Sequence, residues 1–152
     1  MPFTSTRLSQ DAAIVLGLAR TAVPFAASKE DEAERWVRVM RLHGQVGQAM
    51  QALGIGEAPL ESPAVPRAVR LIHDRTDSAQ VVEQVEARAL ELAAERRAQL
   101  VSTVDVFFAL LDIYSTTFER ALYARGATRV ELIAELSRDG FPVPAPYGGV
   151  CA

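Results

Sequence analysis

A chain of 152 residues with a net charge of −3 has room for one domain that buries roughly two-thirds of its unfolded surface. Its 16 Lys and Arg against 19 Asp and Glu leave no basic excess for binding phosphates, so we expect no nucleic-acid partner. No apolar run approaches the roughly 20 residues that span a bilayer, and Cys151 is the only cysteine, so we expect a cytoplasmic protein with no export signal, membrane anchor or intramolecular disulfide.

The first half of the chain predicts three helices. Ser9 stands just before apolar residues at helical spacing and is a suitable N-cap, and Pro24 ends that helix. Ser28 with Asp31 forms a variant of the capping box at the start of a second helix. A short third helix ends at Gly54, where a left-handed backbone is expected.

A proline-rich middle separates this half from the next. It has three prolines within residues 59–66, which exclude a long regular element, and a short helix is expected over residues 67–72. The longest helix is predicted over residues 78–100, and two apolar stripes on it indicate a central helix packed on more than one side. These stripes are Val82, Val85, Ala89, Leu92 and Ala93, and then Ala87, Leu90, Ala94 and Ala98.

Three further helices are predicted after residue 100. Ser102 and Asp105 form a capping pair for the first, Thr116 or Thr117 caps the second, and Thr128 begins the last. No segment alternates polar and apolar residues with a period of two, so we predict an all-α fold.

Apolar positions of the first half recur at nearly constant offsets in the second, as two copies of one helical unit would show. The pairs are Ala12/Ala87, Val15/Leu90, Ala19/Ala94 and Val23/Ala98 at 75 residues, and Val39/Leu111, Val46/Phe118, Ala49/Ala121, Met50/Leu122 and Gly54/Gly126 at 72. We therefore predict two pseudo-repeats of a four-helix unit in one compact domain. The domain comprises residues 1–140, with repeat one at about 9–58, a linking segment at 59–77 and repeat two at about 78–138. A Pro/Gly-rich tail follows at 141–152.

The second unit resembles the Clp amino-terminal repeat. It has an alanine-spaced helix over residues 85–98, a capped helix whose apolar run ends in Ala-Leu-Leu at residues 109–111, and a short helix that ends in Leu-x-x-x-Gly at residues 122–126. The first unit keeps the outline, but the charged run of residues 29–34 replaces the family's Gly-Thr-Glu-His type of loop motif. In the second unit residues 102–105 stand at that place, also without a histidine.

The resemblance implies a function by binding, because Clp amino-terminal domains dock adaptors and substrate polypeptides for an AAA+ unfoldase. The chain has no Gly-x-x-x-x-Gly-Lys-Ser/Thr motif and cannot itself be the ATPase. It is thus expected to be a non-enzymatic peptide-binding module of a chaperone system. Its partner would be an unfoldase, an adaptor, a substrate, or a sheath protein of a secretion machinery.

Six residues are candidates for partner contact: Phe3, Thr4, Trp36, Arg88, Arg96 and Arg97. The Phe-Thr pair is similar to the one that opens the family's repeat, and tryptophan is common in binding hot spots, although core filling is the competing interpretation for Trp36. The arginines suit an anion-binding strip, but Glu91 and Glu95 at salt-bridge spacing favour a solvated face.

Two aromatic residues of the tail, Phe141 and Tyr147, leave two alternatives open: the tail packs back on the body, or it docks in a groove of another protein.

No catalytic residue, metal site or cofactor is expected. His43 and His73 lie 30 residues apart without further ligands at metal-binding spacing, and Cys151 has no base nearby in the sequence. Two alternatives to a peptide-binding module remain: an enzyme with an unrecognised pocket, and a domain that binds a small molecule or associates with itself as a homo-oligomer.

Overall fold

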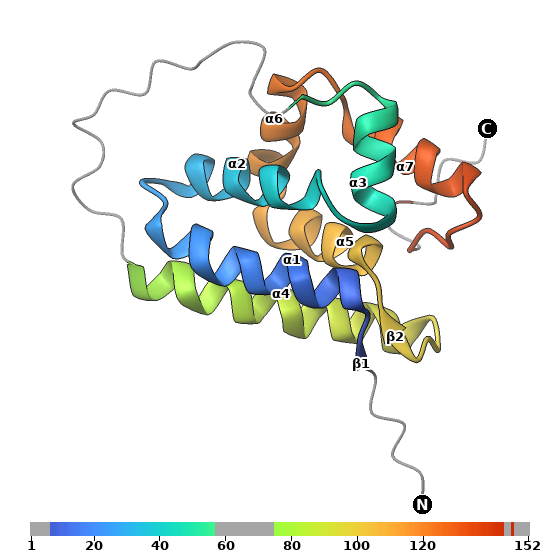
Figure 1. Cartoon of the computed structure of the whole chain (residues 1–152), viewed down its shortest axis with the longest axis horizontal. Coiled ribbons are helices and arrows are strands. Elements are labelled where there is room, and N and C mark those ends of the chain that lie inside the picture. Colours follow the sequence, from blue (N-terminus) through green and yellow to red (C-terminus); the bar gives the residue numbers. More distant parts are fainter. Residues whose placement is uncertain (1–6, 57–74, 145–146, 148–152) are drawn as a thin grey trace, which may run out of the picture.

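Seven α-helices and one 3₁₀ helix form the described part of the chain in the computed structural model, which comprises residues 7–56, 75–144 and 147 (Figure 1). In chain order they are α1 (Gln10–Ala22), η1 (Val23–Phe25), α2 (Lys29–Met40), α3 (Gly44–Ala52), α4 (Arg75–Glu95), α5 (Thr103–Tyr114), α6 (Thr116–Ala124) and α7 (Arg129–Arg138). The predicted all-α class is confirmed. The proline-rich link, the short helix predicted over residues 67–72, and the candidates Phe3 and Thr4 lie outside the described residues.

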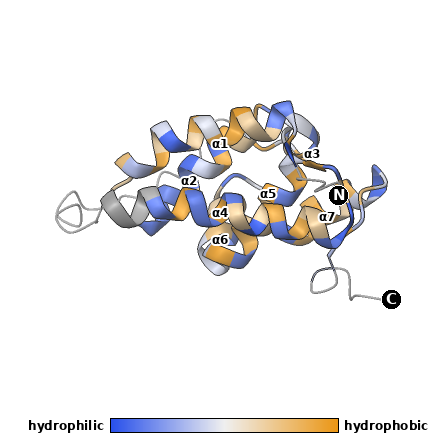
Figure 2. Cartoon of the chain, turned by 90° about the horizontal axis from the view of Figure 1, so that it is seen from below, coloured by the Kyte–Doolittle hydropathy of each residue, from blue (hydrophilic) through white to orange (hydrophobic). Residues whose placement is uncertain are grey.

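Helices α1 and α4 lie side by side and run in opposite directions (Figure 1), and α5 packs against both. The strands β1 (Arg7–Leu8) and β2 (Leu100–Val101) pair in parallel, so the entry to α1 is tied to the connection between α4 and α5. Hydrophobic and hydrophilic residues alternate along α1 and α4 at helical spacing (Figure 2), as expected of helices with one buried face. Within the described ranges, no helix combines the length and apolarity needed to cross a membrane.

Local capping explains where most of these helices begin. The Ser9 hydroxyl accepts a hydrogen bond from a backbone N–H at the start of α1, and Ser28 does the same at the start of α2. Full capping boxes begin α5 and α7, through Ser102 with Asp105 and through Thr128 with Glu131. The predicted caps Ser9, Ser28, Ser102 and Thr128 are confirmed. The box predicted for Ser28 is incomplete, because the Asp31 carboxylate accepts from the Ala27 N–H and not from the N–H of Ser28.

The prediction that Thr116 or Thr117 caps α6 is wrong. Ser115 occupies that position, with a left-handed φ of 52°, and its side chain makes no capping hydrogen bond. The reason is that α5 and α6 share Ser115 as the C-cap of one helix and the N-cap of the next, so Thr116 is already helical.

Helix α5 is the centre of the core, which corrects the prediction that the long helix α4 takes this place. It packs against α1, α2, α3, α4 and α6, and ten of its twelve residues are buried. On α4 only one of the two predicted stripes is buried, and Ala87 and Ala94 are exposed. An alanine methyl contributes little when buried, so alanines do not determine which face of a helix turns inward.

Helix α4 also ends earlier than predicted, at Glu95 rather than near residue 100. Arg97 adopts a left-handed φ of 57°, and the Ala98 N–H donates to the Ala93 carbonyl at 2.9 Å. This bond closes the helix in the way a glycine C-cap usually does.

The two offsets of the predicted repeat differ in how well they match the structure. Helices α3 and α6 have nine residues each and precede glycines with positive φ, 81° at Gly54 and 96° at Gly126. The 75-residue offset pairs buried positions of α1 with the exposed Ala87 and Ala94. Three of the four buried positions of α1, and Val23, recur instead as buried positions 70 residues later, as Ala12/Val82, Val15/Val85, Ala19/Ala89 and Val23/Ala93; the fourth, Leu16, pairs with the half-buried Glu86. The pseudo-repeat itself stays a prediction.

A buried polar chain joins α2 to the end of α5. The Trp36 indole N–H donates to the Tyr114 hydroxyl oxygen at 3.1 Å, and that hydroxyl donates to the Glu32 carboxylate at 2.7 Å. Lys29 Nζ lies 3.5 Å from the same carboxylate. Glu32 is fully buried, and these donors compensate the loss of water around its charge.

Helices α2 and α6 are joined by an ion pair between Glu34 and Arg125. A guanidinium nitrogen of Arg125 lies 2.5 Å from a carboxylate oxygen of Glu34, and the arginine side chain is fully buried. Within the described part of the chain, Nε, Nη1 and Nη2 of Arg125 have no partner in hydrogen-bonding geometry. The ion pair is therefore the interaction that the described structure provides for this buried charge.

The close packing of α3 on α5 predicts a large effect for Gly44→Ala. Gly44 has a φ of 68°, and an added Cβ would lie 2.5 Å from the Thr103 hydroxyl oxygen. We expect the free energy of unfolding to fall by about 2–3 kcal/mol, because backbone strain and overlap add. Denaturant unfolding measures it. Gly17→Ala is the control, since nothing lies within 4 Å of its added Cβ and helix propensity should stabilise it by about 0.5–1 kcal/mol. Equal midpoints for the two variants would contradict this account.

Candidate functional site

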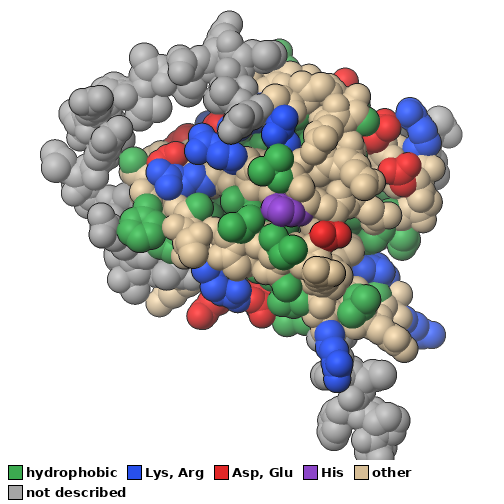
Figure 3. Space-filling view, in the orientation of Figure 1, with side chains coloured by type: hydrophobic (Ala, Val, Ile, Leu, Met, Phe, Trp, Pro, Cys, Tyr) green, Lys and Arg blue, Asp and Glu red, His purple; other side chains and the backbone are tan. Residues whose placement is uncertain are grey.

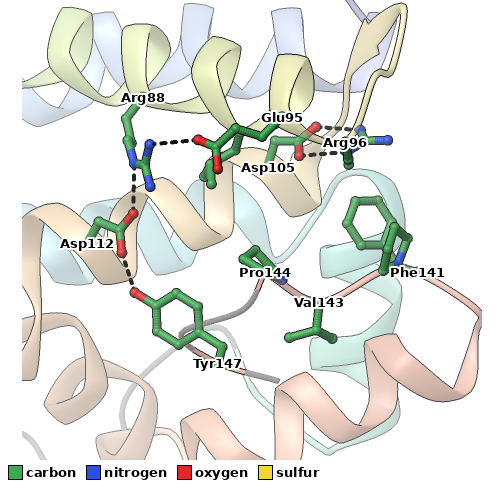
Figure 4. A pocket seen from close by; sticks show the side chains of 11 residues that line it. Arg88, Glu95, Arg96, Asp105, Asp112, Phe141, Val143, Pro144 and Tyr147 are labelled. Carbon is green, nitrogen blue, oxygen red and sulfur yellow. Dashed lines mark hydrogen bonds and ion pairs between the residues drawn. The ribbon is translucent and has the colours of Figure 1, made fainter. Parts of the chain in front are cut away.

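A pocket of about 280 Å³ lies between α4, α5 and the segment that follows α7 (Figure 4). We call the faces of α4 and α5 that line this pocket the α4–α5 groove. Residues 141–144 with Tyr147 lie across from these faces and line the pocket from the other side, and we call them the C-terminal segment. The other lining residues are Arg88, Leu92, Glu95, Arg96, Asp105 and Asp112.

Helical spacing places the charged residues of the groove. Arg88 and Glu95 are seven residues apart on α4, and Asp105 and Asp112 are seven apart on α5, which in each case is about two turns. Each pair therefore lies on one face of its helix. Because α4 and α5 pack against each other, the two faces meet.

At one end of the groove Arg96 forms a two-bonded ion pair with Asp105. Its Nε donates to one carboxylate oxygen at 2.9 Å and its Nη2 to the other at 2.6 Å. The same carboxylate accepts the Ser102 N–H of the capping box, so it is fixed from two sides. The guanidinium carbon of Arg96 lies 4.8 Å from the centre of the Phe141 ring, in a cation–π contact.

At the other end Arg88 donates from Nε to Asp112 at 2.8 Å and from Nη1 to Glu91 at 2.9 Å and Glu95 at 3.3 Å. The hydrogen bond to Asp112 is the main reason that the pKa of Arg88 is raised above its usual value. Three carboxylates thus surround one guanidinium. Arg88 is committed to groups of its own chain and offers no unpaired charge to an anion.

Tyr147 closes this end of the groove. Its hydroxyl donates to the second oxygen of Asp112, and its ring centre lies 5.1 Å from that of Phe108 on α5. The guanidinium carbon of Arg129 lies 5.8 Å from the centre of the same ring. Burial, and then the bond to Asp112, raise the pKa of the Tyr147 hydroxyl above its usual range.

The end of α7 directs the C-terminal segment into the groove. Gly140 has a left-handed φ of 90°, and the Phe141 N–H donates back to the Leu136 carbonyl at 3.2 Å. This is a Schellman ending, which turns the chain sharply out of the helix. Beyond it residues 141–144 are not helical, and the Tyr147 N–H donates to the Pro144 carbonyl at 2.9 Å.

The structure brings together two of the six predicted contact residues, Arg88 and Arg96, and both line the groove. Arg97 is exposed and does not line the groove, so the three arginines form no common strip. Trp36 is 0% exposed, so the expectation that it contacts a partner is wrong, and core filling is the correct interpretation. Its large apolar ring fills the core, and its indole N–H is satisfied there by the Tyr114 hydroxyl at the end of α5.

Sequence analysis missed Asp112 as a site residue. Its spacing of two turns from the capping residue Asp105 was the available signal, because residues seven apart share a helix face. The aromatic residues of the tail were noted, and the packed-back alternative is the one the structure has for Phe141 and Tyr147.

The side chains that line the groove can contact aromatic rings, hydroxyl groups and extended backbone of a ligand. Its arginines and carboxylates are paired with each other, and in the described residues no group of three or more His, Cys, Asp and Glu side chains is placed to share a metal ion. His43 stands at the N-cap of α3, away from the groove.

The described part of the chain is thus an all-α domain with a groove covered by the C-terminal segment, which is non-helical over residues 141–144. No protein-family model, curated protein or solved structure significantly matches this chain.

Proposed function

We propose that this protein is a non-enzymatic peptide-binding module that holds an extended polypeptide segment of a partner in the α4–α5 groove. One observation carries the proposal: a segment of the chain itself, non-helical over residues 141–144, already lies against these helix faces. It is held by side-chain contacts at both ends, through Phe141 on Arg96 and through Tyr147 on Asp112.

The chemistry of the groove suits a proline-containing ligand. Prolines keep a peptide extended before it binds, so less conformational entropy is lost, and they bring no N–H that would need a partner. Leu92 provides an apolar surface for the aliphatic part, and Phe108 stacks with an aromatic ring. Paired charges on both helices orient the ligand without attracting anions in general.

The resemblance to the Clp amino-terminal repeat supports the same class of function and suggests its setting. In that setting the partner is a cytoplasmic AAA+ unfoldase, its adaptor, its substrate, or a component of a secretion machinery. An affinity pull-down with the full chain as bait tests this setting, and recovery of an unfoldase or of its adaptor would support it.

The proposed binding site is tested by selecting peptides from a random displayed library on the full chain and mapping the bound peptides by NMR. We expect the selected peptides to contain proline and an aromatic residue. They should shift the backbone amides of residues 88–96 and 105–112, because those residues line the groove.

Peptide binding or self-association at a second exposed surface would contradict the proposal. Ile14, Leu18, Phe25 and Leu42 are exposed hydrophobic residues of α1, η1 and the turn between α2 and α3, and none lines the groove. Figure 3 shows this side, with hydrophobic side chains around the histidine. Peptide-induced shifts confined to α1 would place the ligand on that face instead of in the groove. Amide shifts on that face that depend only on protein concentration would favour self-association.

A further inference from the structure

The contacts of the C-terminal segment are those of a bound ligand. Phe141 lies on Arg96, Tyr147 bonds to Asp112 and stacks on Phe108, and each contact joins side chains. A separate polypeptide with the same side chains can make all of them.

The segment is also only partly buried, unlike the core below it. Phe141, Val143, Pro144 and Tyr147 are half-buried, and Pro142 is exposed. In contrast Phe107, Phe108 and Leu110 on α5 are buried almost completely. A segment with this degree of burial can leave the groove while the helices keep their core.

Its attachment to α7 gives the segment an advantage over any free ligand. A tethered ligand competes at an effective concentration on the order of millimolar, because it never diffuses away. A free peptide of equal intrinsic affinity therefore binds the intact chain weakly, and binds better when the segment is loosened.

We propose that the C-terminal segment is an intramolecular competitor that occupies the α4–α5 groove until a partner polypeptide with the same anchors displaces it. The inference rests on the proposed function and names its ligand class. The ligand has an aromatic ring for Arg96, an extended proline-containing stretch, and a tyrosine whose hydroxyl donates to Asp112.

The test measures binding of a fluorescently labelled peptide, Phe-Pro-Val-Pro-Ala-Pro-Tyr, to the full chain by fluorescence anisotropy. In the Tyr147→Phe variant the segment loses its hydrogen bond to Asp112, whereas the free peptide keeps its own tyrosine. We expect the variant to bind the peptide about five- to tenfold more tightly than the unaltered chain, which is the effect of one such hydrogen bond.

Two further variants separate competition from a general loosening of the structure. Tyr123→Phe removes a hydroxyl from a side chain that is 73% exposed on α6 and should leave the affinity unchanged. Asp112→Asn weakens the acceptor for the segment and the peptide alike, so it should give no gain in affinity.

The inference and the proposed function fail in distinguishable ways. Equal peptide affinity for the unaltered chain and Tyr147→Phe, while library-selected peptides still bind the groove, overturns the competitor and leaves the proposed function intact. If the labelled peptide binds no variant and the selected peptides avoid the groove, both are overturned.

Discussion

Tyr114→Phe is expected to lower the free energy of unfolding by about 3 kcal/mol. The phenylalanine fills the same space, but the buried Trp36 N–H loses its acceptor and the Glu32 carboxylate loses a donor. A buried N–H without a partner costs about 1–3 kcal/mol, and a hydrogen bond to a charged group contributes about 1.5–3 kcal/mol. Denaturant unfolding followed by tryptophan fluorescence measures the change, since Trp36 is the single tryptophan.

The pH dependence of stability provides a second readout for this variant. Burial, and then the bond to Glu32, raise the pKa of the Tyr114 hydroxyl above its usual value of 10.0. A folded pKa above the unfolded one stabilises the protein fully below pH 10, and this contribution is lost as the pH rises further. The unaltered chain should therefore lose stability more steeply above pH 10 than Tyr114→Phe does. Parallel curves for the two would refute this assignment.

Glu34→Gln is expected to destabilise the protein by about 3 kcal/mol, because it leaves the fully buried guanidinium of Arg125 without its counter-charge. The Glu34 carboxylate is partly accessible, so water compensates some of the loss. The expected value therefore lies at the lower end of the range for a broken buried ion pair. Thermal and denaturant unfolding of the variant measure it.

The matched experiment removes the buried charge together with its partner. In Glu34→Gln combined with Arg125→Met an apolar side chain of similar length replaces the arginine, whose nitrogens lack hydrogen-bonding geometry in the described structure. We expect the double variant to regain most of the stability lost in Glu34→Gln. A double variant less stable than Glu34→Gln alone would mean that Arg125 stabilises the fold through other contacts.

Local rules predicted the helices well because the interactions that begin and end a helix span only a few residues. Ser9, the Ser102 box and the Thr128 box are examples, and each joins a side chain to a backbone group two or three residues away. Ser115 escaped prediction because its left-handed φ depends on how α5 and α6 pack, and nothing in its own side chain indicates it.

The candidate site was predicted only in part, for the same physical reason. Arg88 and Arg96 were identified from their spacing on one helix. The partners that define their role, Asp112 and Phe141, lie 24 and 45 residues further along the chain and reach them only through packing.

By itself the sequence determined the all-α class, most helix starts and the glycine that ends α3, since helical periodicity and capping are local properties. Only the tertiary structure decided that α5 is central and that Trp36 is internal. It also decided that the C-terminal segment returns to the groove. Each of these features depends on which apolar and charged surfaces meet across long stretches of chain. Which surfaces meet depends on how much apolar surface the whole fold buries.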